Sequence, residues 1–187
     1  FRVLMSMTFL ELASRLRQEV GGSGTGPTSV TSQTGESRRI VDWIISSDQD
    51  VQRARNQWRF MRSGFTGNTV ANTAAYAYTA CTDTTSSIAI ASFREWVKDS
   101  FKIYLSSAGV GGETALDFIS YDEWYRRYNT GTQVAACPTE FTVLNNLSFS
   151  LGDKPDAVYV VTGEYQKAIT ALAAAGDVPL YPSEYHM

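Results

Sequence analysis

Side chains that carry covalent or acid–base chemistry are few in this sequence. His186 is the only histidine among 187 residues, which excludes a histidine-containing catalytic triad and a histidine-rich metal site. A nucleophilic Cys81 would need a neighbouring base, which only a lysine or the distant His186 would supply. We therefore interpret Cys81 as a buried or strand-packed thiol, and His186 as a packing or hydrogen-bonding residue at a helix start.

Two pairs of acidic residues have the spacing of an acid–base pair but are explained by local structure. Asp122 and Glu123 are adjacent, yet Glu123 is expected to complete a capping box, and neighbouring arginines keep both carboxylates ionised. Asp153 and Asp156 flank a proline turn, where aspartate is favoured on conformational grounds. Neither pair predicts catalysis.

The glycine-rich segment 21–26 does not have the context of a phosphate-binding loop. It follows a predicted helix rather than a strand, and no Lys-Ser or Lys-Thr pair closes it. Cys81 and Cys137 are far apart and lack metal-ligand spacing, which is typical of a protein kept reduced in the cytosol, although a disulfide between them stays open. The sequence therefore predicts no catalytic residue, no metal site and no cofactor.

Aromatic residues give the strongest local pattern. Ser120 and Glu123 form a capping box, and Ile119 and Trp124 a hydrophobic staple, so a helix is predicted over 121–128. Four rings recur at i, i+3, i+4 and i+7 on one side of it: Tyr121, Trp124, Tyr125 and Tyr128. Two interpretations stay open, a helix packed on its own sheet or a surface that also meets another chain. The ten tyrosines and four tryptophans of the chain leave a further alternative, a β module that stacks sugars on flat rings of a rigid sheet.

Two longer helices are predicted near the N-terminus. A second capping box, Thr8 and Glu11, begins the first, Gly21-Gly22 ends it, and 21–35 is a polar linker. The second helix is expected from near Glu36 to about Phe60, with an apolar stripe at near-heptad spacing. Three arginines would line one edge of its second half: Arg55, Arg59 and Arg62. We interpret that edge as solvated or ion-paired with another subunit, with phosphate contact as the alternative.

From Ser63 onward, alternation replaces helical periodicity and predicts strands. Alternating patterns occur at Tyr76/Tyr78, at Ile88/Ile90 and over 101–105. A hairpin is expected over 141–151, turning at Asn145-Asn146 because asparagine tolerates positive φ, and 157–161 is expected to be the third strand of a meander.

We thus expect an α+β fold in which an antiparallel sheet or sandwich is inserted into a helical bundle. The predicted parts are a helical part, 7–62, a β-rich insertion, 63–170, that contains the helix 121–128, and a return loop, 171–187. Ser183 to Met187 is expected to be the first turn of a helix.

The overall charge and the ends of the chain bound the remaining possibilities. A net charge of −3 argues against a protein that coats nucleic-acid phosphates, but is compatible with a wall past which DNA slides. No segment has the length of a membrane-spanning helix, and Phe1 to Leu10 does not read as a signal peptide, so synthesis in the cytoplasm is expected. We expect the natural start to lie after Leu4 and the chain to continue beyond Met187.

Motifs from Met7 to His186 together resemble those of the head-to-tail adaptor (neck or connector) proteins of tailed bacteriophages. The motifs are Thr8-Phe-Leu-Glu-Leu-Ala-Ser-Arg-Leu-Arg17, Gly24-Thr-Gly-Pro27, Gln33-Thr-Gly-Glu36, Ile40-Val-Asp-Trp-Ile44, Trp58-Arg-Phe60, Asp99-Ser-Phe-Lys-Ile-Tyr104, Leu116-Asp-Phe-Ile-Ser-Tyr-Asp-Glu-Trp124 and Asp177-Val-Pro-Leu-Tyr-Pro-Ser-Glu-Tyr-His186.

The resemblance implies a non-enzymatic virion subunit in the neck of the phage. Such a protein forms a homo-oligomeric ring, typically dodecameric, below the portal protein and leads to the next tail or nozzle protein. Double-stranded DNA passes through its lumen without sequence-specific binding, and no membrane takes part. The alternatives are another neck or tail-completion subunit, such as a stopper or nozzle, and a carbohydrate-binding β module.

Overall fold

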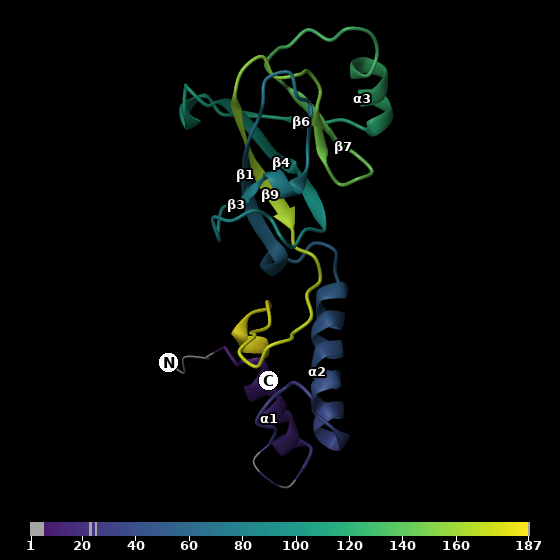
Figure 1. The fold of residues 1–187 in the computed structure, drawn as a ribbon, viewed down its shortest axis with the longest axis vertical. Helices are drawn as coiled ribbons and strands as arrows, with labels where there is room; N and C mark the ends of the chain where they lie inside the picture. The colour runs from purple at the N-terminus through teal and green to yellow at the C-terminus, as the bar shows by residue number, and fades with distance from the viewer. Residues whose placement is uncertain (1–5, 23, 25, 187) are drawn as a thin grey trace. The chain divides into compact units, whose positions relative to one another are not determined.

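The computed structural model describes residues 6–22, 24 and 26–186. Helices and mostly antiparallel sheets are both present, so the predicted α+β class is confirmed (Figure 1). The chain forms two compact units, which we call the helical unit, residues 1–61 with 169–187, and the β unit, residues 62–168. Phe1 to Leu4, part of the glycine-rich segment (Ser23 and Thr25) and Met187 lie outside the described residues.

The first helix of the helical unit begins where the sequence predicts. Thr8 caps α1 (Phe9–Glu19): its side chain accepts from the backbone N–H of Glu11, and the Glu11 carboxylate accepts from the backbone N–H of Thr8, which completes the capping box. Phe9, Leu12 and Ala13 are buried and pack with apolar residues of the second helix in the core of this unit. The predicted start of α1 is confirmed.

The second helix, α2 (Gly35–Arg53), ends well before Phe60, so the predicted C-terminal boundary is wrong. Five polar or small residues, 53–57, follow its last apolar position, Val51, and offer no further face to bury. The indole N–H of Trp58 donates to the carbonyl of Val51 at 2.8 Å. That carbonyl is among the last four of the helix, which lack intrahelical partners, so Trp58 folds back over the helix end instead of extending it.

The C-terminal segment packs beside the start of α1 (yellow in Figure 1). The N–H groups of Phe9 and Leu10, in the first turn of α1, donate to the carbonyls of Asp177 and Ala175 at 2.7 and 3.1 Å. His186 is buried; its Nδ1 accepts from the backbone N–H of Met7 at 3.1 Å, and its Nε2 lies 3.0 Å from the carbonyl of Tyr181. The predicted packing and hydrogen-bonding role of His186 is confirmed, although Ser183–Tyr185 forms a 3-10 turn.

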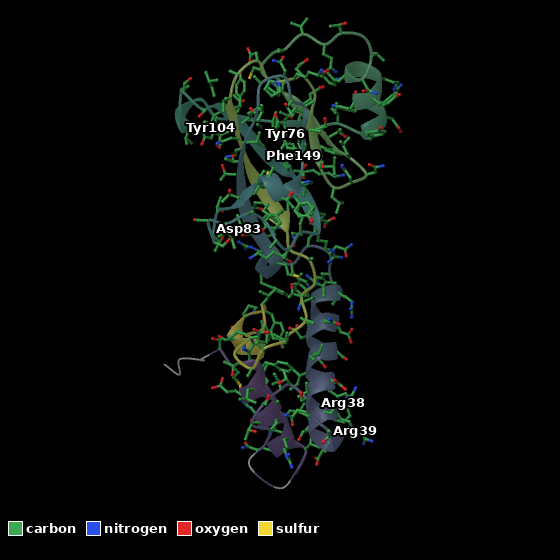
Figure 2. All side chains as sticks on the ribbon, in the orientation of Figure 1. Arg38, Arg39, Tyr76, Asp83, Tyr104 and Phe149 are labelled. Atoms are coloured by element: carbon green, nitrogen blue, oxygen red, sulfur yellow. The ribbon has the colours of Figure 1, made fainter. Side chains whose placement is uncertain are left out.

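Two sheets make up the β unit, and their inner faces form its aromatic core. A five-stranded sheet has the order β3 (Thr82–Asp83), β1 (Arg62–Asn68), β9 (Tyr159–Gln166), β4 (Glu95–Leu105), β5 (Thr114–Ala115). A four-stranded sheet has the order β2 (Ala75–Tyr76), β8 (Phe149–Leu151), β7 (Glu140–Val143), β6 (Asp117–Phe118). Within the core, Tyr76 stacks on Phe149 with ring centroids 5.4 Å apart (Figure 2).

The predicted hairpin is present, but the predicted meander is not. β7 and β8 pair antiparallel, yet β9 joins the other sheet between β1 and β4. β1 pairs with β9 over seven residues, from Arg62 opposite Gln166 to Asn68 opposite Val160, whereas β8 has three residues in all. The longer partner satisfies more backbone groups of β9. In the hairpin turn, the positive φ falls on Leu147 rather than on the asparagines.

Two of the predicted strand patterns are largely wrong, and one is confirmed. β2 ends at Tyr76, and Tyr78 begins a 3-10 turn in which its ring stacks on Phe93 at 4.6 Å. Ile88 is exposed and Ile90 buried, but neither lies in a named strand. The pattern over 101–105 does lie in a strand, β4, where Phe101 and Ile103 are buried. The short alternating runs thus overstated strand length, and the buried face that they predict was wrong at Ile88.

Candidate interaction surfaces

The aromatic helix α3 (Tyr121–Tyr128) has the predicted bounds and half of the predicted cap. The Ser120 hydroxyl accepts from the backbone N–H of Glu123 at 3.3 Å. The Glu123 carboxylate, however, pairs with the Arg127 guanidinium one turn later, and Arg127 also pairs with Glu140. The reciprocal half of the capping box is replaced by an i, i+4 ion pair along the helix.

Two of the four rings of α3 face the sheet. The indole N–H of Trp124 donates to the carbonyl of Leu151 at 3.0 Å, and the hydroxyl of Tyr128 donates to the Glu140 carboxylate at 2.7 Å. Burial, and then the hydrogen bond to Glu140, raise the pKa of Tyr128 to about 12. A Cβ at Gly152 would approach the Tyr128 ring to 2.8 Å, so this glycine lets the ring lie against the turn. Trp124 and Tyr128 therefore fix α3 to the β unit.

The other two rings reach solvent. Tyr121 and Tyr125 are 48% and 49% exposed, and their ring centroids lie 6.0 Å apart. Near them is a groove of about 500 Å³ lined by Glu95, Trp96, Lys98, Phe118, Ser120, Tyr121, Val143 and Leu147. We call Phe118, Tyr121, Tyr125 and Leu147, all exposed, the α3 surface. The sequence pattern predicts one common face for the four rings, and this prediction is wrong. The rings divide into an inward pair and an outward pair.

Two exposed acidic residues are chain neighbours of the α3 surface. Asp117, in the edge strand β6, and Asp122, in the first turn of α3, are exposed. Among the described residues, no ion pair involves either carboxylate. The nearby cation Lys98 lies over the Phe118 ring, 4.1 Å from its centroid. This end of α3 thus presents aromatic rings next to free negative charge.

The predicted arginine edge is not formed, because α2 ends before it. Arg55 follows the helix, and its guanidinium lies over the Trp58 ring, 5.1 Å from the centroid. Arg59 begins a 3-10 turn. Arg62 lies in β1, in the β unit, where it pairs with Glu164 at 3.3 Å. The prediction that the three arginines share one helix face is wrong. The prediction that they pair with another subunit stays a prediction.

A second apolar surface lies on the helical unit, and the sequence alone did not predict it. A cavity of about 490 Å³, which we call the helical groove, is lined by Val51, Trp58, Phe60, Tyr181, Pro182 and Tyr185. Trp58 stacks on Phe60 at 5.1 Å, and Phe60 meets Tyr181 edge-on at 6.4 Å. Tyr185 is 68% exposed, and a smaller adjoining cavity extends to Trp43, which is 55% exposed. Exposed aromatic residues beside a cavity are typical of a contact with another molecule.

A buried carboxylate lies in the same unit. Asp48 of α2 accepts from the Gln52 side chain at 2.7 Å, and Gln52 also bonds both backbone groups of Thr170. Burial raises the pKa of Asp48, while Gln52 and the nearby His186 oppose that shift. This network ties α2 to the C-terminal segment that carries Tyr181 and Tyr185.

The other side chains that the sequence analysis considered for catalysis or metal binding lie in surroundings that give them structural roles. Burial raises the pKa of the Cys81 thiol to about 12, so the predicted buried thiol is confirmed. Asp156 accepts from the Tyr159 hydroxyl at 2.7 Å. Across the described residues, no group of three or more His, Cys, Asp or Glu side chains has the arrangement of a metal site. No helix in the described part of the chain is long and apolar enough to cross a membrane.

The α3 surface and the helical groove are exposed aromatic surfaces on two units whose side chains are otherwise hydrogen-bonded and packed. Such surfaces are typical of a structural protein that assembles with other chains. The chain belongs to the SU10 adaptor protein family, whose family model matches residues 7–187. This is a family of phage head-to-tail adaptors, structural proteins of the virion at the junction of head and tail, and the resemblance to adaptor proteins is confirmed. A comparison with curated proteins gives no match.

Proposed function

We propose that this protein is the subunit of a homo-oligomeric ring, dodecameric in the assembled neck, that docks below the portal protein and leads to the next tail or nozzle protein. The observation that carries the proposal is the family match, which extends over residues 7–187. Membership of an adaptor family implies contacts with other virion components. The helical unit is the ring body in this proposal, and the β unit contacts neighbouring subunits or tail components.

The distribution of charge supports a lumen through which double-stranded DNA passes. Residues 62–168 carry eight lysines and arginines against eleven aspartates and glutamates, and the rest of the chain carries eight of each. Neither unit carries an excess of positive charge, so neither binds phosphates tightly, and DNA in the lumen moves without being held. Contact with DNA is therefore proposed to be sequence-independent and weak.

Binding to the portal protein of the same phage tests the proposal. The full chain is mixed with the purified portal, complex mass is measured by light scattering, and the virion neck is reconstructed by electron microscopy. We expect a ring of this chain in direct contact with the portal. A ring located elsewhere in the neck would make the protein a stopper or nozzle, and a stable monomer absent from the neck would contradict the proposal.

The outward rings of α3 are proposed to take part in these contacts. Tyr121→Ala combined with Tyr125→Ala removes exposed rings and leaves the packed Trp124 and Tyr128 in place. We expect this variant to fold normally and to assemble poorly. Val134→Ala is the matched control, because Val134 is an exposed apolar residue in a loop outside both surfaces. Equal assembly of the two variants would remove α3 from the proposed contacts.

A further inference from the structure

Two arginines beside the helical groove form no ion pair among the described residues. Arg55 and Arg59 are exposed on the segment that carries Trp58 and Phe60. Within the described residues, no ion pair includes either guanidinium, and the contact of Arg55 is with the Trp58 ring. Of the acidic residues nearby, Asp50 pairs with Arg53, and Glu184 lies in the 3-10 turn with Tyr185. Two arginines against one glutamate, none of them in an ion pair within the described part of the chain, leave the apolar groove with an excess of positive charge.

The α3 surface has the opposite combination. Two exposed carboxylates neighbour it in the chain: Asp117 precedes Phe118 and Asp122 follows Tyr121, and the described residues supply no ion pair for either. Further acidic groups, Glu95 and Asp99, lie on the adjacent strand β4. Of the cations near this surface, Arg127 pairs with Glu123 and Glu140, Arg126 donates to the carbonyl of Asp122, and Lys98 lies over the Phe118 ring. Among the described residues here, the acidic side chains without an ion pair therefore outnumber the cations without one.

We propose that the helical groove of one copy binds the α3 surface of a second copy of this chain. Tyr121 and Tyr125 of one copy enter the groove between Trp58 and Tyr185 of the other, while Asp117 and Asp122 pair with Arg55 and Arg59. The inference deepens the proposed function, because it rests on self-association. Complementary charge selects a second copy as the occupant, since both halves of the contact, two free arginines and two free aspartates, are present in every chain.

Two properties of such a contact follow from its chemistry. Tyrosine, tryptophan and arginine are the residues that dominate binding energy when they fill pockets, and this contact would consist mostly of them. Its two halves are different patches, so the contact is heterologous: each copy offers a free groove and a free α3 surface, and association propagates from copy to copy. If the rotation between successive copies brings the last copy into contact with the first, the copies form a closed ring.

A charge-swap experiment on the full chain tests the inference. One variant carries Arg55→Glu and Arg59→Glu, a second carries Asp117→Lys and Asp122→Lys, and a third carries all four. Self-association is measured by sedimentation over a range of concentrations. We expect each double variant to weaken self-association about tenfold or more, and the four-fold variant to recover it, because the swapped charges attract again.

The matched control is Arg38→Glu with Arg39→Glu, two exposed arginines near the start of α2 (Figure 2). They lie about 20 Å along the helix from its C-terminal end, at 1.5 Å per residue, and glutamate is favoured near a helix start. This variant changes charge equally and should associate like the parent chain. Unchanged circular dichroism confirms that all variants fold, since every substituted side chain is exposed.

Several results would overturn the inference. They are a parent chain that stays monomeric at the highest concentration reached, an effect of one double variant without the other, failure of the four-fold variant to recover association, and equal weakening by the control. None of these contradicts portal binding by the parent chain, which tests the proposed function separately. A parent chain that binds the portal but not itself would retain the adaptor role and reject this contact.

Discussion

Replacing Trp124 by alanine should destabilise the β unit, although less than removal of a fully buried ring. Its indole N–H donates to the buried carbonyl of Leu151, and leaving that carbonyl without a partner costs about 1 kcal/mol. Trp124 is half-buried, so the lost apolar contact adds about 1–2 kcal/mol at about 25 cal/mol per Å². We expect Trp124→Ala to lower the free energy of unfolding by about 2–3 kcal/mol, below the loss of about 3–5 kcal/mol typical of core aromatics.

Tyr125→Ala, one position along the same helix, is the control that makes this prediction specific. Tyr125 is exposed, so the substitution should change the free energy of unfolding by no more than about 0.5 kcal/mol, helped by the higher helix propensity of alanine. Urea unfolding followed by near-ultraviolet circular dichroism reports the packed rings of the β unit. Equal losses in the two variants would refute the division of α3 into inward and outward rings, as would a stable Trp124→Ala protein.

Three further substitutions test the interiors of the units. In Asp83 burial opposes ionisation, but hydrogen bonds from side chains and two backbone N–H groups hold its pKa below the ordinary value. Its contribution is therefore complete above about pH 4 and lost as the pH falls toward the lowered folded-state pKa; Asp83→Asn should cost about 1–3 kcal/mol at pH 7 and flatten the acid limb of a pH-dependent unfolding series. Gly163→Ala places a Cβ 2.9 Å from the buried ring of Phe65 and should cost about 1–3 kcal/mol by thermal or urea unfolding, whereas Gly111→Ala, with open space around it, should be nearly neutral. Burial raises the pKa of Asp48, so its contribution is present at about pH 4 and lost as the pH rises through the raised value; Asp48→Asn should gain about 1 kcal/mol over the parent at pH 7, and the gain should vanish near pH 4.

Local chemistry made the starts of α1 and α3 predictable. Thr8 and Ser120 accept the hydrogen bonds that their spacing to glutamate predicts, because an N-cap depends on residues three positions apart. The end of α2 was not predictable in the same way. Continuation past Arg53 depended on whether Trp58 would add an apolar position to the stripe or bond the carbonyl of Val51, and both fit the spacing.

Contacts between distant segments were beyond the reach of periodicity. The placement of β9 beside β1 joins residues about one hundred positions apart, and the predicted meander failed because sequence neighbours were assumed to be sheet neighbours. The helical groove was missed for the same reason, since Tyr181 and Tyr185 meet Val51 and Trp58 from the far end of the chain. Trp43 was a signal of this surface in the sequence, because it places a large aromatic ring on an amphipathic helix outside its predicted apolar stripe.

The pattern at α3 also shows why periodicity cannot separate a core from an interface. Rings at i, i+3, i+4 and i+7 span an arc wider than the contact that an eight-residue helix makes with one sheet edge. Trp124 and Tyr128 occupy the half of that arc that faces the sheet, and Tyr121 and Tyr125 occupy the other half, which reaches solvent. If α3 served only to stabilise the fold, we would expect polar residues at positions 121 and 125, because exposed aromatic rings there favour association with other molecules. We therefore propose a partner, rather than the fold, as the reason for the two outward tyrosines.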